Sequence, residues 1–275
     1  MTAWEAVLLG IVQGLTEFLP VSSSGHLVLA ETLLDIKENG IAFEIFAHFG
    51  TLMAVVTVFK SDFLQIFREM LAYLTGKPQD GTLNSEGKQV FGGMRLTGSL
   101  VVGTVPAAII GYAFRGTFER SFAHPEFVSV ALIVTGVILI LSRFAREKGE
   151  ELSYGKGFMI GLAQVIAFFP GISRSGTTIT TGLLLGVSPF ESARFSFLLA
   201  VPLILGVTGL KFFELLANPL SFDQTLTLII GCVASYASGL LAIKWLLSLV
   251  QKGKFDRFAY YCITVGILGV ILFSL

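Results

Sequence analysis

Charged residues are scarce in this chain: of its 275 residues, 14% are charged and 53% are hydrophobic. A soluble domain of this length carries roughly a quarter of charged residues. The composition therefore excludes an ordinary soluble domain and predicts an all-α integral membrane protein. The formal net charge is zero and no basic tract is present, so nothing favours a nucleic-acid partner.

Cysteine is also scarce. Cys232 and Cys262 both lie in apolar stretches, without the spacing of a redox pair or a metal site, and we expect them to be small buried residues. The N-terminus lacks a basic region before its first apolar stretch and carries Glu5. We therefore expect no cleaved signal peptide.

Long apolar runs are what the chain has in abundance. A membrane-crossing helix needs about 20 mostly apolar residues, and six segments meet or approach that length. They are residues 41–59, 94–114, 127–142, 193–213, 226–248 and 257–274. We predict that these are six transmembrane helices, and that the amphipathic segment 62–73 lies in the cytoplasmic interface.

Two further apolar segments, about 3–34 and 155–188, are interrupted by proline and by a run of serine and glycine. The arm after each interruption is too short to cross a bilayer. Irregular backbone at membrane depth is tolerated only where protein or a water-filled cavity satisfies it. We predict two re-entrant helix-loop-helix hairpins whose tips meet inside the bundle.

These two segments resemble each other. Residues 10–26 align without a gap with residues 161–177, at an offset of 151 residues, and six positions of this alignment are identical. The pairs are Gly10 with Gly161, Gln13 with Gln164, Phe18 with Phe169, Ser22 with Ser173, Ser24 with Ser175, and Gly25 with Gly176. Repeated, broken apolar segments of this kind build sites near the middle of a membrane.

Charge placement predicts the orientation. Twelve lysines and arginines fall in residues 60–95, 143–156 and 249–257, and three fall in residues 35–40, 115–126 and 214–225. Because cytoplasmic loops are enriched in lysine and arginine, we expect the first set inside and both termini outside. Three crossings, an odd number, separate the hairpins. This predicts one membrane domain over residues 1–275, built from inverted repeats of about 1–142 and 152–275.

We call the proline-, serine- and glycine-rich interruption of each segment a knot. The second knot, residues 170–178, places Arg174 between Ser173 and Ser175 at the apparent start of a helix. Free N–H groups of a helix N-terminus, hydroxyl donors and a guanidinium together suit a phosphate group. Gly171 and Gly176 allow close approach of the backbone. The alternative is an arginine paired with a buried carboxylate, with serines that cap the helix.

The first knot, residues 20–26, contains Ser22, Ser23 and His26, and it suggests a second phosphate-binding segment of this kind. Glu17 precedes it, and Gln13 lies on the same helix face, four residues earlier. Their oxygens suit a hard cation such as Mg²⁺ or Ca²⁺. His26 suits a general acid, base or nucleophile, and Ser23 suits a nucleophile that His26 activates. The alternative is a helix-cap network around a histidine with satisfied hydrogen bonds.

Glu44 and His48 are another pair spaced by four residues, on the span after the first hairpin. Ionisable groups inside a membrane are costly, so each is a functional candidate. A supporting or proton-linked role is open for this pair. Glu191 and Arg194 suggest local pairing at a helix start instead.

The run Glu17-Phe-Leu-Pro-Val-Ser-Ser-Ser-Gly-His26, followed later by Pro170-Gly-Ile-Ser-Arg-Ser-Gly-Thr-Thr178, resembles the undecaprenyl-diphosphatase family, also called bacitracin-resistance proteins. The resemblance covers essentially the whole chain. It implies six crossing helices with two re-entrant hairpins in inverted repeat, in the bacterial inner membrane, with the site open to the periplasmic side. It also implies that the protein is an enzyme that removes the terminal phosphate of undecaprenyl diphosphate and so recycles the lipid carrier for peptidoglycan synthesis.

Residue by residue, the resemblance implies catalytic roles for Glu17, Ser23, His26 and Arg174. Binding of the substrate phosphates is expected from Arg174 together with serine, glycine and threonine residues of both knots. These residues are Ser22, Ser173, Ser175, Gly176 and Thr178. Gln13 stands where many relatives have glutamate, which leaves Glu17 as the anionic ligand of a divalent cation, Mg²⁺ or Ca²⁺, with Gln13 assisting.

The main alternative function is a transporter that flips the polyprenyl phosphate lipid, because inverted repeats with broken helices are transporter architecture. A non-catalytic scaffold explains the polar residues of the knots less well. The expected partners are the polyprenyl diphosphate lipid and the bilayer. Glycines that suit helix contacts leave a homodimer open; they are Gly103, Gly111, Gly231 and Gly239.

Overall fold

The computed structural model describes residues 1–33, 40–75, 93–146, 149–217 and 220–273. Within these ranges the chain is helical, apart from turns, connecting segments and one isolated β-bridge between Glu150 and Val187. The helices, in chain order, are α1 (Ala3–Phe18), α2 (Ser23–Leu33), α3 (Gly40–Val58), α4 (Lys60–Leu74), α5 (Gly93–Ala113), α6 (Arg115–Ser121), α7 (Pro125–Leu141), η1 (Ser142–Phe144), α8 (Tyr154–Ala163), η2 (Gln164–Phe168), α9 (Arg174–Leu184), α10 (Pro189–Ala217), α11 (Phe222–Gln251), η3 (Phe255–Arg257) and α12 (Phe258–Phe273).

Six of these helices, α3, α5, α7, α10, α11 and α12, coincide with the six predicted spans. In the described part of the chain, five of them are long and apolar enough to cross a membrane alone. Helix α3 reaches that criterion only together with α4, from which it bends by 81°. The protein is therefore a multi-pass membrane protein with five such helices, or six when the bent pair is counted.

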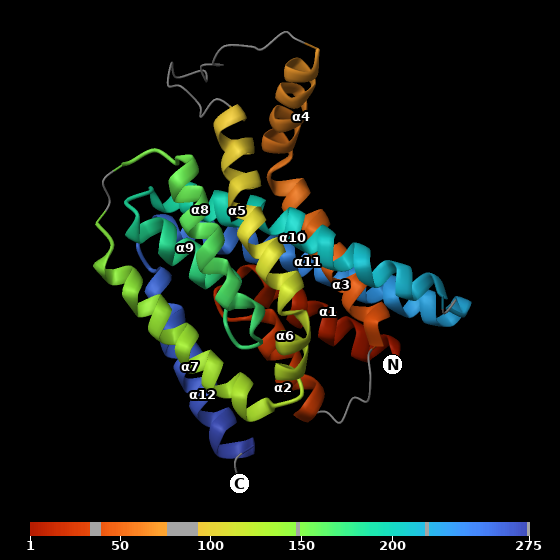
Figure 1. Ribbon diagram of the computed structural model, residues 1–275. Helices are drawn as coiled ribbons and strands as arrows, with labels where there is room; N and C mark the ends of the chain where they lie inside the picture. The colour runs from red at the N-terminus through yellow and green to blue at the C-terminus, as the bar shows by residue number, and fades with distance from the viewer. Residues whose placement is uncertain (34–39, 76–92, 147–148, 218–219, 274–275) are drawn as a thin grey trace.

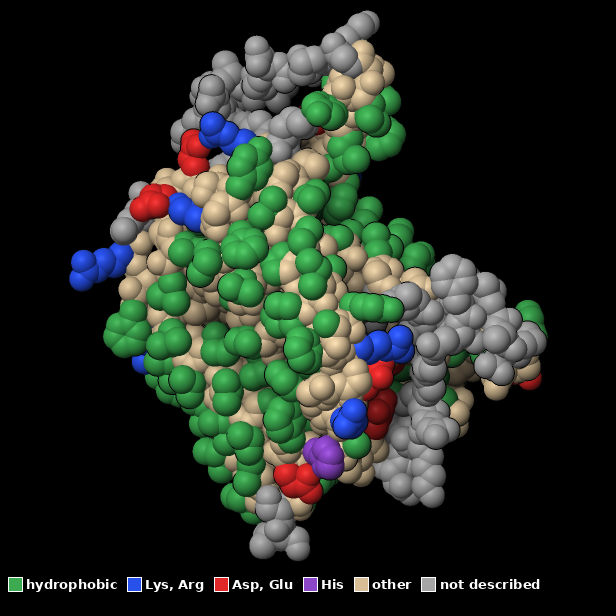
Figure 2. Space-filling view, in the orientation of Figure 1, with side chains coloured by type: hydrophobic (Ala, Val, Ile, Leu, Met, Phe, Trp, Pro, Cys, Tyr) green, Lys and Arg blue, Asp and Glu red, His purple; other side chains and the backbone are tan. Residues whose placement is uncertain are grey.

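The surface agrees with a lipid environment. Figure 2 shows hydrophobic side chains across the middle of the visible face, with charged side chains gathered towards its upper left and lower right. On α7, the side chains of Val130, Val134 and Val137 are 43–51% exposed and follow one another along one side of the helix. An exposed apolar stripe is unfavourable in water. It is stable against lipid, because contact with hydrocarbon chains keeps its apolar surface away from water.

The segment predicted to be amphipathic forms α4, which projects from the rest of the bundle (Figure 1). Leu64, Phe67 and Leu71 are exposed on it, whereas Phe63 and Ile66 pack against the core. Its placement in the cytoplasmic interface stays a prediction.

The first broken segment is two helices, α1 and α2, and its break follows from local chemistry. Pro20 has no N–H to donate, so it cannot supply the hydrogen bond that would extend α1. Ser22 then adopts a φ of 69°, in the left-handed region that few non-glycine residues enter. Helix α2 begins at the next residue and is only 11 residues long, which is too short to cross a bilayer.

The second broken segment, α8–η2–α9, is built in the same way. Gly171 has a φ of 95°, and a side chain there would also collide with the carbonyl of Val128. Only glycine fits this position. Ser173 then caps α9, because its Oγ accepts a hydrogen bond from the N–H of Gly176 at 3.0 Å.

Close glycine contacts hold the broken segments against long helices. Helix α1 packs along α11, and α8 packs along α5 (Figure 1). A Cβ at Gly10 would collide with the carbonyl of Gly231, and one at Gly161 would collide with the carbonyl of Gly103. Helix backbones that approach this closely gain van der Waals contact that lipid cannot supply.

The other two glycines predicted at helix contacts also pack within the chain, Gly111 against Phe168 and Gly239 against Phe18. Both cysteines are free; Cys262 is buried as expected, whereas Cys232 is half-buried.

A buried ion cluster fixes the bend between α3 and α4. Arg194 on α10 donates through Nε to Asp62 Oδ1 at 2.7 Å, and its Nη2 also contacts that carboxylate. Its Nη1 donates to both carboxylate oxygens of Glu191, at 3.1 and 3.0 Å. The predicted local pairing of Glu191 with Arg194 is confirmed, and Asp62 is a partner that the sequence did not indicate.

We expect Arg194→Ala to lower the free energy of unfolding by about 3–5 kcal/mol, because it leaves two carboxylates without their cation in a poorly solvated place. The measurement is denaturant unfolding in mixed micelles. Arg95→Ala is the control: Arg95 and Glu151 form an ion pair whose side chains are 64% and 65% exposed, so its loss should cost less than about 1 kcal/mol. Equal losses in the two variants would contradict this role of Arg194.

Candidate active site

The two knots touch each other. Ser22 Oγ accepts a hydrogen bond from the N–H of Gly171 at 3.1 Å, and Ser175 Oγ donates to the carbonyl of Leu19 at 3.2 Å. A Cβ at Gly25 would stand 3.0 Å from the Cα of Gly171. Segments about 150 residues apart in the sequence thus form one polar cluster.

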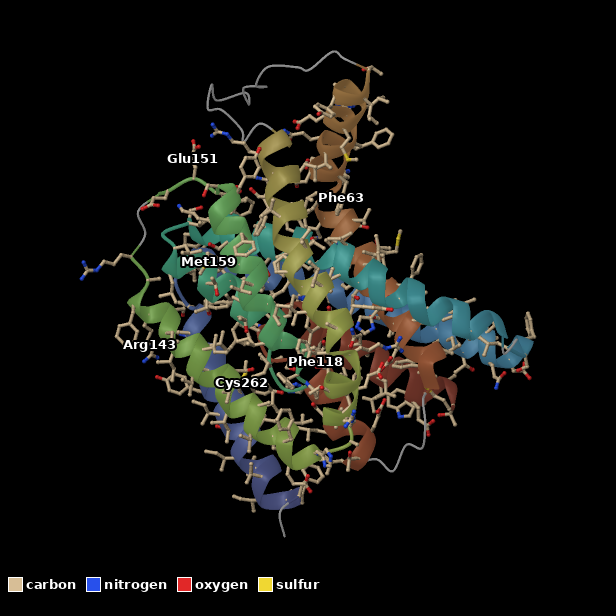
Figure 3. The ribbon with its side chains drawn as sticks, viewed as in Figure 1. Phe63, Phe118, Arg143, Glu151, Met159 and Cys262 are labelled. Carbon is tan, nitrogen blue, oxygen red and sulfur yellow. The ribbon has the colours of Figure 1, made fainter. Side chains whose placement is uncertain are left out.

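Aromatic and apolar contacts flank this cluster. The ring of Phe118 lies 4.9 Å from that of Phe169, centroid to centroid, and Cys262 Sγ donates to the carbonyl of Pro20 at 3.5 Å. Figure 3 labels Phe118 and Cys262 on either side of the turn of the second hairpin. The knots are therefore held from α6 and α12 as well as by each other.

Glu17 is the centre of the cluster. Its Oε1 accepts from Arg174 Nη2 at 2.6 Å, and its Oε2 accepts from Ser23 Oγ at 2.7 Å and from Gln13 Nε2 at 3.0 Å. The Glu17 residue is only 8% exposed. A buried carboxylate needs donors to replace its water, and here both knots supply them.

Glu17 and Arg174 line a cavity of about 180 Å³. Its polar residues come from α1, both knots, α3, η2 and α10, and its apolar residues come from the second knot, η2, the α6–α7 connection and α10. The polar lining residues are Thr16, Glu17, Ser22, Ser23, Ser24, His48, Gln164, Ser173, Arg174 and Thr208, and the apolar ones are Phe122, Ala167, Phe168, Ile172, Leu203 and Ile204. A lining that is partly polar and partly apolar suits an amphipathic ligand.

Three buried polar atoms at this site have no hydrogen-bond partner. They are Arg174 Nη1, Gln13 Oε1 and Gln164 Oε1. Buried donors and acceptors are almost always paired, because each unpaired one costs about 1–3 kcal/mol. An unpaired guanidinium donor beside a cavity indicates a ligand with acceptor oxygens, and an unpaired amide oxygen indicates a donor or a cation.

His26 is not among the residues that line this cavity. Its Nδ1 is 2.9 Å from the carbonyl of Ser22 and its Nε2 is 2.8 Å from the hydroxyl of Tyr261. The two rings stack with an interplanar angle of 8°. Both ring nitrogens are thus engaged, which matches the alternative of a satisfied histidine within a cap network. A catalytic role of His26 stays a prediction without support from this geometry.

The hydroxyls of the second knot are also engaged. Ser173 Oγ caps α9, and Thr178 Oγ1 lies 2.8 Å from the carbonyl of Arg174, to which it donates, and 2.6 Å from Ser196 Oγ. Ser173 lines the cavity, whereas Ser175, Gly176 and Thr178 are buried and do not. Of the residues predicted to bind phosphate, Ser22, Ser173 and Arg174 reach the cavity.

Sequence reasoning missed Thr135 and Tyr261 and gave His48 little weight. Thr135 Oγ1, on α7, donates to the carbonyl of Gly171 at 2.7 Å and accepts from the N–H of Ser173 at 2.9 Å. It therefore joins the two sides of the second knot. Its signal in the sequence was a threonine inside the apolar span 127–142, where polar residues are costly.

The described residues include no group of three or more His, Cys, Asp and Glu side chains arranged for a metal ion. The side-chain oxygens that the site does offer include the carboxylate of Glu17 and the unpaired Oε1 atoms of Gln13 and Gln164. Hard cations take such oxygens and complete their shell with water and ligand phosphates. The residues therefore fit a cation that is bound jointly with a phosphate ligand.

A buried carboxylate that holds a serine hydroxyl, opposite a guanidinium with a free donor, is suited to phosphoryl transfer. The guanidinium stabilises charge on phosphate oxygens, and the carboxylate can accept the hydroxyl proton.

Comparisons with known proteins agree with this chemistry. A family model described as bacitracin resistance protein BacA matches residues 6–268. A protein named undecaprenyl-diphosphatase from Salinibacter ruber is 43% identical over 274 residues, which is 99% of this chain and 100% of that protein. Proteins of the same name from Christiangramia forsetii and Korarchaeum cryptofilum are 38% and 39% identical, and the matches cover 98% and 96% of this chain and the same shares of those proteins.

Proposed function

The chain belongs to the bacitracin resistance protein BacA family, and from that premise we propose that it is an undecaprenyl-diphosphatase. It hydrolyses undecaprenyl diphosphate to undecaprenyl phosphate and inorganic phosphate. This returns the lipid carrier for cell-wall synthesis. The relatives above are named for hydrolysis, and no observation favours the transporter alternative.

The observation that carries this function is the contact between Glu17 and Arg174 across the two knots, with Ser23 on the same carboxylate. Arg174 keeps one donor, Nη1, without a partner. A diphosphate that enters the cavity supplies acceptors for this donor and competes with Glu17 for the guanidinium, since bidentate contacts with phosphate are strong. Substrate binding would therefore free the carboxylate for proton transfer.

The apolar wall supports a lipid tail. Phe168, Leu203 and Ile204 line the cavity, and Leu205, the next residue on α10, is 54% exposed. The headgroup would contact the polar lining residues while the first isoprene units leave along this wall into the bilayer. Burial of the tail is favourable because no apolar surface meets water.

We propose Ser23 as the nucleophile. Its hydroxyl already donates to Glu17 Oε2 at 2.7 Å, so Glu17, and not His26, is placed to take its proton. Ser23 Oγ would form a bond to the terminal phosphorus while the bridging P–O bond breaks. The leaving undecaprenyl phosphate keeps the bonding electron pair, the proton goes to Glu17, and Arg174 stabilises the charge on the transferred phosphoryl group.

We propose that Glu17 and the Oε1 of Gln13 hold a divalent cation, Mg²⁺ or Ca²⁺, together with the diphosphate. Such a cation, when bound, neutralises charge on the phosphate oxygens. With one carboxylate at this position, its affinity in the absence of substrate would be low.

The membrane arrangement is part of the same proposal: six crossings, two re-entrant hairpins and inverted repeats in one domain, with the site on the extracytoplasmic side of the plasma membrane. The exchanged glycine contacts support the repeats, because Gly10 meets Gly231 and its counterpart Gly161 meets Gly103. A homodimer stays a prediction, since the glycines that suggested it pack inside the chain.

Phosphate release from a polyprenyl diphosphate by the purified, detergent-solubilised protein tests this function. We expect release with Mg²⁺ or Ca²⁺, and a rate lowered about 100-fold or more by a chelator, because several kcal/mol of charge stabilisation is lost. The control substrate is the polyprenyl monophosphate, which should release no phosphate. Absence of phosphate release by folded protein under all metal conditions would rule out the proposed phosphatase activity and favour the lipid-flipping alternative.

A further inference from the structure

A second histidine reaches the cavity, although the first knot contains the more conspicuous one. His48, on α3, is a lining residue together with Glu17, Ser23 and Arg174. It lies near enough to Glu17 and Arg174 to interact electrostatically with both. His26, in contrast, has both ring nitrogens engaged outside the cavity.

One ring nitrogen of His48 is anchored. Its Nδ1 lies 2.8 Å from the carbonyl of Glu44, one helical turn earlier. A carbonyl only accepts, so Nδ1 carries the proton, and Nε2 carries a lone pair. Among the described residues, no hydrogen bond engages Nε2.

The backbone that carries His48 is held rigidly. Gly50 packs against the carbonyl of Cys232 on α11, Ser235 Oγ donates to the carbonyl of Ala47 at 2.8 Å, and Thr51 Oγ1 donates to the carbonyl of His48 at 2.8 Å. A catalytic group must be held in this way to act at a fixed distance from the substrate. His48 is thus a fixed proton acceptor on the wall of the cavity.

The proposed attack by Ser23 leaves a phosphoserine that must be hydrolysed, and Ser23 and Glu17 cannot complete this step by themselves. After the first half-reaction Glu17 holds the proton of Ser23, and a phosphoryl group is bonded to Ser23 Oγ. Water must then be deprotonated as it attacks phosphorus, and a protonated Glu17 cannot do this. The base must be another group that lines the cavity.

We propose that His48 is the general base of this second half-reaction, an inference that rests on the proposed function. The water oxygen bonds to phosphorus while the bond from phosphorus to Ser23 Oγ breaks. One water proton passes to His48 Nε2, and the proton on Glu17 returns to Ser23 Oγ. Inorganic phosphate leaves, and His48 gives its proton to solvent. The next cycle then begins with neutral His48 and ionised Glu17.

The test uses a polyprenyl diphosphate labelled in its terminal phosphate, with His48→Gln and His48→Ala proteins. Glutamine can donate to the Glu44 carbonyl but cannot act as a base. We expect kcat to fall about 10²–10⁴-fold in both variants, as for loss of a general base. KM should fall with it and leave kcat/KM nearly unchanged, because the slowed second half-reaction lets the phosphorylated protein accumulate. The first turnover should release one monophosphate lipid per protein while the label stays on the protein. Imidazole should accelerate His48→Ala but not His48→Gln.

His124→Gln is the matched control, because His124 is exposed at the start of α7 and lines no part of the cavity; it should match the wild type. Label should be absent from the double variant that also carries Ser23→Ala. The inference is overturned if His48→Gln turns over at the wild-type rate, if it raises only KM, or if the first turnover is slow and no label is trapped. Failure of the wild type itself to release phosphate would instead overturn the proposed function.

Discussion

Arg174→Ala should abolish turnover almost completely, with kcat lowered about 10³–10⁵-fold, the range found when an arginine that stabilises a transferring phosphoryl group is removed. Among the described residues that line the cavity, Arg174 is the only arginine or lysine. It contributes one donor to Glu17 and keeps a second donor, Nη1, without a partner. The measurement is phosphate release at saturating lipid, with thermal unfolding to establish that the variant is folded.

Arg174→Lys separates charge from geometry. Lysine restores the positive charge but cannot contact Glu17 and a phosphate through a planar fork, so we expect partial recovery of kcat, well below the wild-type value. The second control is Arg194→Lys, which affects a buried arginine bound to Asp62 and Glu191, outside the cavity. A folded Arg174→Ala protein with more than a tenth of the wild-type kcat would remove Arg174 from the mechanism.

Ser23→Ala should lower kcat about 10⁴-fold or more and leave lipid binding largely intact, as for removal of a nucleophile. Among the described residues, Ser23 Oγ is the only hydroxyl that donates a hydrogen bond to Glu17. Steady-state hydrolysis and a binding assay with the monophosphate lipid measure the two effects separately. No label from the terminal phosphate should remain on the variant after quenching.

Ser24→Ala is the matched control, since Ser24 is the next residue and also lines the cavity, but its hydroxyl contacts only Ser22 Oγ, at 3.4 Å, among the described residues. We expect its kcat to fall less than about tenfold, because no reacting atom is lost. If Ser23→Ala kept a tenth of the wild-type activity, water activated by Glu17 would replace Ser23 as the nucleophile, and the phosphoserine step would not exist.

Much of the fold could be predicted from the sequence. The six apolar spans coincide with α3, α5, α7, α10, α11 and α12, because the length of an apolar run is a local property. The breaks after Phe18 and Phe168 were also indicated locally, by a proline followed by a serine- and glycine-rich run. Proline alone does not end a helix here, since Pro106 and Pro202 lie inside α5 and α10. The bend of 81° between α3 and α4 was not expected as such; it depends on Arg194, which is more than 130 residues away from Asp62.

Three of the residues predicted for the site, Glu17, Ser23 and Arg174, are in contact in the structure. Their catalytic roles stay predictions. His26 was expected to activate Ser23, yet the structure points its ring at Tyr261 on α12. The spacing of His26 from Ser23 cannot show the direction in which a side chain leaves a short helix that follows a residue with positive φ.

The sequence by itself determined that this protein lies in a membrane, that two broken segments carry its polar residues, and which family it resembles. These properties are set by composition and by short motifs, in which each residue acts through its neighbours in the chain. Only the tertiary structure decided that Glu17 pairs with Arg174, that Thr135 holds the second knot, and that His48 instead of His26 lines the cavity. Those contacts join helices far apart in sequence, and burial makes each of them necessary, because a polar group without water must find its partner wherever packing places one.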